Sequence, residues 1–494
     1  MSFDPSDAHA PAETPSGADV AARNRLVIAL LLISTFVVIL NETIMSVALP
    51  TLMEELVVTA SAAQWLSSGF MLTMAVVIPI TGFLIQRFNT RPIFIAAMTL
   101  FSIGTLLCAI APSLPPLIFG RIVQACGTAI MIPLLMTTVM TLVPPQSRGK
   151  TMGNISIVIS VAPALGPTIS GFILDNLTWR WMFWLVLPIA LAALAVGYMR
   201  MKNVTTPRIA PIDVISVVLS AIGFGGLVYG LSHFGEGAIG VPTVALWTPI
   251  GFGVAGIAAF VARQLILQRE DKALLDLRTF RSGIFTVSTI MMALAMMSLF
   301  GVVILLPMFT RNVLGLDASQ TGLLLLPGGL VMGLMAPFVG RLYDKIGPTM
   351  LVIPGSIIVS SALWSLTFMD QNTVYGWLLA AHITLSVGLA LLFTPLFTAS
   401  LGSLPGHLYS HGSAIIGTLQ QVAGAAGTAL FVALMTGQAA ALIAEGADAT
   451  PAMAGGIRLA FQVGGAFSLL MVLSAFFIRK PEDAGVSGEP VPEH

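Results

Sequence analysis

Long apolar stretches separated by short polar turns run through almost the whole chain. A helix that crosses a bilayer needs about 20 predominantly apolar residues, and fourteen stretches meet this requirement. They are, in chain order, residues 26–49, 63–85, 92–112, 115–142, 151–174, 181–200, 212–232, 244–266, 283–310, 320–341, 349–369, 375–396, 412–436 and 457–478. The pattern therefore predicts an all-α integral membrane protein with fourteen transmembrane helices.

Lysine and arginine fall on alternate turns between these helices. With the N-terminus inside, 18 of the 22 basic residues lie on the inner side, whereas only Arg180, Arg311 and Arg458 lie outside and Arg121 lies within a helix. Because cytoplasmic loops carry the excess of positive charge, we predict that both termini are cytoplasmic. The alternation also supports the helix count, since a missed helix would swap the sides of every later loop.

The two ends of the chain are polar. Residues 1–22 are rich in Ala, Pro, Ser and Asp, and residues 481–494 are similarly polar. We expect both to be disordered cytoplasmic tails. The first one lacks the basic start, short apolar core and small-residue cleavage site of a signal peptide, so no cleavage is expected.

Composition narrows the function classes. Hydrophobic residues make up 56% of the chain and charged residues only 9%, against about a quarter charged in soluble domains. The net charge of zero gives no case for a nucleic-acid partner. The turns are too short to house a catalytic domain. The two cysteines lie in apolar stretches and suggest packing rather than a metal site or a disulfide.

Two motifs of soluble enzymes occur in the chain, but neither has the structural or sequence setting that its function requires. The run Gly251–Gly256 matches G-x-G-x-x-G, but it lies inside the eighth apolar stretch without a βαβ setting. Gly149-Lys150-Thr151 resembles the end of a phosphate-binding loop, but Pro144 stands where the first glycine is required. We therefore predict neither an enzyme nor an ATP-driven pump, which leaves secondary transport.

An internal repeat divides the chain. Residues 82–91 follow the second apolar stretch and residues 340–349 follow the tenth, 258 positions later. In both we expect a glycine to end a helix before a tight basic turn. Two parallel halves explain this spacing if two extra helices lie between them. The predicted parts are a six-helix bundle at 23–202, two linker helices at 203–275 and a second six-helix bundle at 276–480.

Two charges lie deep inside apolar stretches, Glu42 in the first and Arg121 in the fourth. A charge within hydrocarbon is costly, so its presence indicates a function or a dedicated partner. Counted from the outer ends of their helices at 1.5 Å per residue, both lie about 10 Å deep. We predict that they pair, directly or through Asn41 or Gln124. The hypothesis is proton coupling by Glu42, and the alternative is a static pair that holds two helices together.

The two repeated turns resemble the signature G-x-L-x-D-[RK]-x-G-[RK] of the major facilitator superfamily. The second copy, from Gly340 to Gly347, is nearly complete. The first copy carries Gln86 where the family has Asp and Asn89 where it has Gly. The degraded first copy weakly favours a protein that has lost transport, whereas the second copy argues against that.

Three further segments support the resemblance. Arg121 and Gln124 match the fourth-span pattern R-x-x-Q-G, and residues 163–171 resemble the fifth-span antiporter pattern G-P-x-x-G-G. Residues 40–50 resemble the first span of fourteen-span drug:proton antiporters, and the pair Asn41-Glu42 is similar to the lincomycin-efflux-like subgroup. The resemblance covers nearly the whole chain and implies two six-helix bundles plus two extra central helices.

The resemblance also implies roles for individual residues. Asp344 and Lys345 would lock the inner face by contacting neighbouring helix ends, unless they merely form a solvated turn. The glycines and prolines of the fifth span would allow close helix approach and a bend, which overlaps with ordinary packing. The residues implied in conformational change are Gly82, Arg87, Arg91, Gly340, Asp344, Lys345, Gly347, Pro163, Gly166, Pro167 and Gly171.

Three other polar residues inside apolar stretches are candidates for a substrate cavity. His382 lies in the twelfth stretch, where a hydrogen-bonded core histidine is the simpler interpretation. Gln420 and Gln421 lie in the thirteenth, and at least one of them is expected to face the cavity.

These observations predict a proton-coupled exporter of drugs or other amphiphilic small molecules that works by alternating access. It would need no cofactor apart from protons, no metal and no nucleic acid, and would act as a monomer in the bilayer of a bacterial cytoplasmic membrane. The alternatives are an exporter of a dedicated natural substrate, such as a lipid, siderophore or antibiotic, and a non-transporting membrane sensor.

Overall fold

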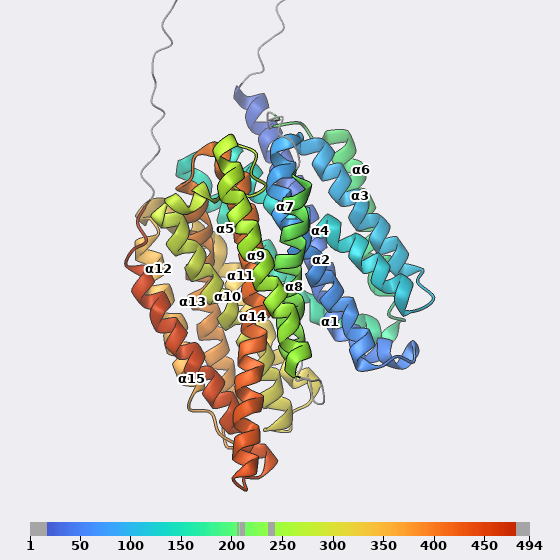
Figure 1. Cartoon of the computed structure of the whole chain (residues 1–494), viewed down its shortest axis with the longest axis vertical. Coiled ribbons are helices and arrows are strands. Elements are labelled where there is room, and N and C mark those ends of the chain that lie inside the picture. Colours follow the sequence, from blue (N-terminus) through green and yellow to red (C-terminus); the bar gives the residue numbers. More distant parts are fainter. Residues whose placement is uncertain (1–16, 205–206, 208–212, 236–242, 481–494) are drawn as a thin grey trace, which may run out of the picture.

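The computed structural model describes residues 17–204, 207, 213–235 and 243–480, and this part of the chain is helical, with no strand. It contains fourteen helices long and apolar enough to cross a membrane, which confirms the predicted number. The helices stand side by side in one bundle (Figure 1).

The first half contains six long helices. They are α1 (Gly17–Glu55), α2 (Ala60–Arg87), α3 (Thr90–Ala109), α4 (Leu114–Leu142), α5 (Arg148–Asn176) and α6 (Trp181–Arg200). The first helix is longer at both ends than the predicted 26–49. Residues 17–22 are helical rather than part of a disordered tail, because alanine, with its high helix propensity, fills half of these positions. Residues 1–16 and 481–494 lie outside the described part.

Two extra membrane spans follow. One consists of α7 (Val214–Ser220), a π-helical turn (Ala221–Gly225) and α8 (Gly226–Gly235), and the other is α9 (Thr243–Leu267). Glycines let α8 and α9 approach closely, since a Cβ on Gly253 would lie only 2.5 Å from the Leu227 nitrogen. The G-x-G-x-x-G run of α9 thus contributes to helix packing.

The second half again contains six long helices. They are α10 (Gly283–Asn312), α11 (Ala318–Ile346), α12 (Thr349–Leu366), α13 (Tyr375–Gly402), α14 (Tyr409–Ala444) and α15 (Ala449–Ala475). Short 3-10 turns at Gln268–Glu270 and Leu277–Arg281 lie between α9 and α10.

The repeated glycines lie inside helices, so the expectation that they end them is wrong. Helix α2 continues beyond Gly82 to Arg87, and α11 continues beyond Gly340 to Ile346. The physical reason is packing between the halves. A Cβ on Gly340 would lie 2.1 Å from the carbonyl oxygen of Gly149 on α5, and α11 instead ends at Gly347, whose φ of +79° favours glycine.

The two halves meet closely at one end of the bundle. The first described residues of α1 and the last of α15 lie toward this same end, here called the terminal end (Figure 1). Hydrogen bonds join the halves near it, including Thr137–Ser413 and Ser156–Thr394 at 2.8 Å each. These contacts lie near the last residues of α4 and α13 and near the first residues of α5 and α14. Together with the packing of Gly340 on Gly149, they close the bundle at its terminal end.

Candidate functional site: a buried arginine network and a closed terminal end

Arg121 is enclosed by the first half, with only 2% of its surface exposed. Its guanidinium donates hydrogen bonds to Gln124 Oε1 at 2.6 Å, Asn41 Oδ1 at 3.3 Å and the Leu66 carbonyl oxygen at 3.4 Å. The guanidinium carbon also lies 4.0 Å from the centre of the Phe70 ring, a geometry in which the ring face attracts the cation. Arg121 therefore links α4 to α1 and α2 without a charged partner in direct contact.

The network extends to α3. Gln124 donates through Nε2 to Thr105 Oγ1 at 2.8 Å, and Thr105 donates to the Phe101 carbonyl oxygen at 2.7 Å. The two helices approach closely because Gly104 leaves room, since a Cβ there would lie 2.4 Å from the Gln124 nitrogen. Gln124 thus holds its side-chain oxygen toward Arg121 and its amide group toward α3.

Glu42 is half-buried and makes no direct ion pair with Arg121. The two charges still lie near enough to interact electrostatically. Arg121 contacts Asn41 and Gln124, but among the described hydrogen bonds none joins either residue to Glu42, so the pairing of Glu42 with Arg121 stays a prediction. A carboxylate that is not fixed in an ion pair can gain or lose a proton without breaking a salt bridge.

The fifth-span motif packs beside Glu42. Thr43 donates to the Ala162 carbonyl oxygen of α5 at 3.4 Å, and a Cβ on Gly166 would lie 2.2 Å from Thr43 Oγ1. Gly166 therefore permits the contact between α1 and α5. Pro163 is exposed and Gly171 has open space around it. The side chain of Pro167 lies outside the described residues.

Asp344 caps the start of α5 from the opposite half. Its two carboxylate oxygens accept hydrogen bonds from the backbone N–H groups of Gly149 and Lys150, at 2.8 Å each. Negative charge at a helix N-terminus is stabilising, so this cap favours the closed terminal end. Lys345 beside it is exposed.

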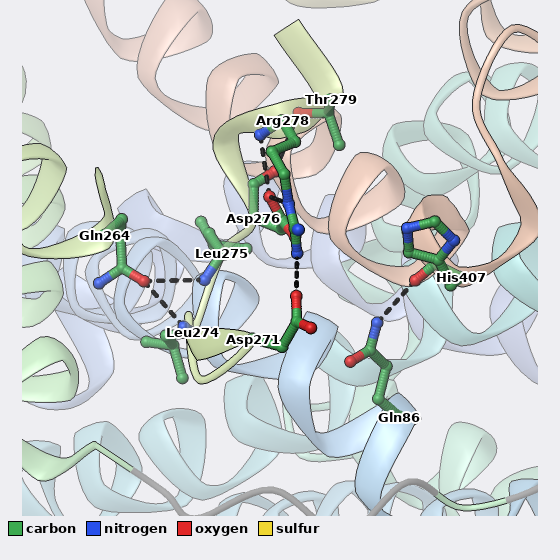
Figure 2. Close-up of polar contacts among 9 residues, drawn as sticks. All are labelled: Gln86, Gln264, Asp271, Leu274, Leu275, Asp276, Arg278, Thr279 and His407. Atoms are coloured by element: carbon green, nitrogen blue, oxygen red, sulfur yellow. Dashed lines mark hydrogen bonds and ion pairs between the residues drawn. The ribbon is translucent and has the colours of Figure 1, made fainter. Parts of the chain in front are cut away.

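Gln86 occupies the matching position in the first half. Its amide donates to the main-chain carbonyl oxygen of His407, just before α14, at 2.8 Å (Figure 2). Gly82 on the same helix faces α14, where a Cβ would lie 3.3 Å from the Ser410 carbonyl oxygen. In the sequence, Gln86 is only a departure from a motif. The repeat spacing of 258, which relates it to Asp344, was the signal for its contact.

The two arginines of the first turn contact aromatic residues of their own half. Arg87 lies over the Phe83 and Phe88 rings. Arg91 donates to the Tyr198 carbonyl oxygen at 2.8 Å and lies over that residue's ring. The Arg91 contacts join α3 to α6, whereas the ring contacts of Arg87 lie within α2 and its C-terminal cap.

The candidate cavity residues fall into different environments. Gln421 on α14 points toward α2 of the other half, where its amide lies 3.9 Å from Met74 Sδ. Gln420 is half-buried like Gln421, but no such contact with the other half is found for it among the described residues. His382 lies between α13 and α11, with 4% of its surface exposed and Nε2 3.2 Å from the Leu325 carbonyl oxygen.

A second polar cluster, which the sequence did not reveal, holds the connection between α9 and α10 (Figure 2). The buried Gln264 side chain accepts from the Leu274 and Leu275 N–H groups at 2.8 and 3.2 Å. Asp276 is also buried and binds the Arg278 side chain. Burial acts to raise the pKa of Asp276, but the hydrogen bonds from Arg278 outweigh it and lower that pKa below its usual range.

Asp213 and Arg263 form an ion pair between α7 and α9. Arg263 donates to both carboxylate oxygens, at 2.6 and 2.7 Å, and Asp213 also caps α7 through the Ser216 N–H. These hydrogen bonds, Arg263 first, lower the pKa of Asp213. The carboxylate therefore stays charged and ties the two extra helices together.

Two sets of six long apolar helices with two more between them are the architecture of one class of membrane transporters. The sequence profile of the Major Facilitator Superfamily matches residues 31–428, and the chain belongs to that family. Its members are transporters rather than enzymes.

The relatives include named resistance proteins. The chain is 40% identical to the lincomycin resistance protein LmrB of Listeria monocytogenes, over 92% of this chain and 96% of the relative. It shows the same identity to the uncharacterized MFS-type transporter YcnB of Bacillus subtilis, over 92% and 95%. A multidrug resistance protein B homolog of Mycobacterium tuberculosis is 30% identical, over 81% of this chain and 74% of the homolog.

Solved structures share the fold. The human organic anion transporter MFSD10 gives a TM-score of 0.67 at 15% identity, covering 92% of this chain and 99% of that one. The proton:xylose symporter XylE gives 0.65 at 16% identity, covering 94% and 97%. These likenesses establish a multi-pass membrane protein with the major-facilitator fold.

Proposed function

We propose that the protein is a proton-coupled exporter of drugs or other amphiphilic small molecules, with Glu42 as the proton carrier. The observation that carries the proposal is the surroundings of the Glu42 carboxyl group. It lies half-buried beside a charge network in which Arg121 is satisfied by Asn41, Gln124 and Phe70. Arg121 can therefore act electrostatically on the Glu42 carboxylate without forming a salt bridge with it.

The coupling step follows from electrostatics. Arginine remains protonated inside proteins, so the guanidinium is a fixed positive charge near Glu42. Movement of α1 against α4 or α5 changes the hydration of Glu42 and its distance from Arg121, and both factors set its affinity for a proton. The Thr43–Gly166 contact couples this position to α5, which also carries the Asp344-capped end.

We also propose an orientation in the membrane and a conformational state for the protein. Both termini lie in the cytoplasm of a bacterium, in agreement with the distribution of basic residues. The closed terminal end is then the cytoplasmic end, and the protein is poised to exchange substrate and proton with the outside. We further propose that it works as a monomer, with protons as the coupling ion and no cofactor.

Lincomycin is the first compound to test, because the name of a close relative refers to resistance against it. The test uses proteoliposomes with an imposed proton gradient and compares the wild type with Glu42→Gln. The variant keeps the shape of the side chain but cannot release a proton. We expect gradient-driven accumulation to be lost while substrate exchange without a gradient persists.

Glu55→Gln is the matched control, because Glu55 is an exposed acidic residue on the same helix. It should transport like the wild type. Undiminished proton-driven transport by folded Glu42→Gln would refute the role of Glu42. Transport of no tested drug by the wild type would instead shift the proposal to a dedicated natural substrate.

A further inference from the structure

His382 and Arg121 occupy matching places in the two halves. Each is the eighth residue of the fourth long helix of its half, α13 for His382 and α4 for Arg121. Both are almost completely buried, with 4% and 2% of their surfaces exposed. Counted from the start of its helix, each half therefore has an ionisable side chain at the same position of its fourth helix.

The contacts of the two residues also match. Arg121 donates to the Leu66 carbonyl oxygen on α2 at 3.4 Å, and His382 Nε2 lies 3.2 Å from the Leu325 carbonyl oxygen on α11. Leu66 is the seventh residue of α2 and Leu325 the eighth of α11. In both halves a basic side chain on the fourth helix thus ties that helix to the second.

The ring of His382 is held from two sides. A Cβ on Gly328 would lie 2.4 Å from Nε2, so only glycine leaves room for the ring. Ser386 donates its hydroxyl to the main-chain carbonyl oxygen of His382 at 2.9 Å. The other ring nitrogen, Nδ1, is buried and has no hydrogen-bond partner. With Nε2 as the donor to Leu325, Nδ1 carries an unused lone pair.

An unpaired buried polar atom in a native protein calls for an explanation. The site is too closed for an organic substrate, because the imidazole is buried and clamped by Gly328. A proton, delivered by water when the neighbouring helices separate, is small enough to reach Nδ1. Histidine is the side chain whose charge ordinarily changes between about pH 5 and 8.

The groups in contact with His382 are neutral, namely the Leu325 carbonyl, the Ser386 hydroxyl and Gly328. Charged and titratable groups on the helices packed against α13 lie toward the ends of those helices, and α12 has none. They are Arg311 on α10, Arg341, Tyr343, Asp344 and Lys345 on α11 with Asp317 as its N-cap, Arg148, Lys150 and Asp175 on α5, Tyr409 and His411 on α14 with Glu445 as its C-cap, and Tyr375 on α13 itself.

We propose that His382 is the ionisable counterpart of Arg121 in the second half, and that its Nδ1 binds and releases a proton during the transport cycle. The proton comes from water on one side and forms an N–H bond at Nδ1, while Nε2–H stays on Leu325. The imidazolium then returns the proton to water after the bundle changes state. This inference rests on the proposed proton-coupled function and adds a second titrating group to Glu42.

The test is His382→Gln, because the glutamine amide can still donate to Leu325 but cannot bind a proton. We expect the variant to fold and to transport. Its transport rate should depend less steeply on pH than that of the wild type, because one titrating group is missing. His407→Gln is the matched control, since His407 is exposed and its contact with Gln86 uses only the main-chain carbonyl. It should keep the wild-type profile.

A second measurement works without transport. Nitrogen-15 spectra of the purified wild type, with the six histidines distinguished by single substitutions, should show Nδ1 of His382 gaining a proton as the pH is lowered. An unchanged pH profile in His382→Gln, or a ring that stays neutral across the range, would overturn the inference. Failure of the proposed function is separate, because it shows as a wild type that moves substrate without protons.

Discussion

At the scale of single residues, Arg121 shows how a charge is held inside a membrane protein without an ion pair. Two side-chain amide oxygens, one backbone carbonyl and one aromatic ring surround it. A buried salt bridge to Glu42 would have compensated the charge, but it would also have fixed the carboxylate. The neutral shell leaves Glu42 available for proton exchange.

Arg121→Lys tests this shell. Lysine keeps the charge but lacks the planar fork that reaches Asn41 and Gln124 and stacks on Phe70. Hydrogen bonds to charged groups contribute about 1.5–3 kcal/mol, and about 1.4 kcal/mol corresponds to tenfold in rate. We therefore expect proton-driven transport to fall about tenfold or more in proteoliposomes, with normal folding by size-exclusion chromatography. A lysine variant with wild-type transport would show that the charge alone suffices.

The sequence could place Glu42 and Arg121 at one depth, because helix rise converts residue counts into distance. It could not identify Leu66 or Phe70 as partners, since a backbone carbonyl and an apolar ring carry no distinctive signal. It also could not separate Gln420 from Gln421. Neighbouring residues on a helix point about 100° apart, and only packing shows that Gln421 faces α2.

At the scale of helices, the two halves use related contacts in chemically different ways. Asp344 accepts from two backbone N–H groups at the start of α5, whereas Gln86 donates one hydrogen bond to a carbonyl oxygen before α14. Only the first contact carries a charge toward a helix N-terminus. The closed terminal end is therefore held more strongly at the α5–α11 contact.

Asp344→Asn should loosen this end. Asparagine has one acceptor oxygen, so one of the two N–H groups loses its partner, at a cost of about 1 kcal/mol. That cost raises the population of the open terminal end about fivefold. Electron-paramagnetic-resonance distances between spin labels on the exposed Gln146 and Lys345 would report it, in a background without Cys108 and Cys126.

Asp370→Asn is the control for charge removal, since Asp370 lies in the turn between α12 and α13, away from the cap. It should leave the label distances unchanged. Equal distances in Asp344→Asn and the wild type would mean that the carboxylate does not stabilise the closed state.

At the scale of the whole molecule, the hydrophobic pattern was enough to predict fourteen helices, because bilayer thickness fixes helix length, and the repeated turn divided them into two halves. The turn motif was less informative about geometry. Its glycines were expected to end helices, yet they lie within α2 and α11 and face the opposite half. A single sequence does not distinguish a glycine that ends a helix from one that lets two helices touch.

The close contact between Gly340 on α11 and Gly149 on α5 predicts a substitution that blocks the transport cycle. A Cβ on Gly340 would lie 2.1 Å from the Gly149 carbonyl oxygen and 3.0 Å from the Gly153 Cα, and both partners are backbone atoms that cannot turn aside. Gly340→Ala should therefore prevent α11 from closing on α5. The bundle would remain open at the terminal end, and transport should fall about tenfold or more, since a cost above about 1.4 kcal/mol is expected from such overpacking.

Gly322→Ala on the same helix separates this effect from a general effect of alanine, because a Cβ at Gly322 has no atom within 4 Å. We expect it to transport like the wild type. Spin labels on Gln146 and Lys345 should show a longer distance in Gly340→Ala than in Gly322→Ala. If both variants transport normally with equal distances, the closed contact between Gly340 and Gly149 is not a required state, and alternating access must close this end by a different packing of α5 and α11.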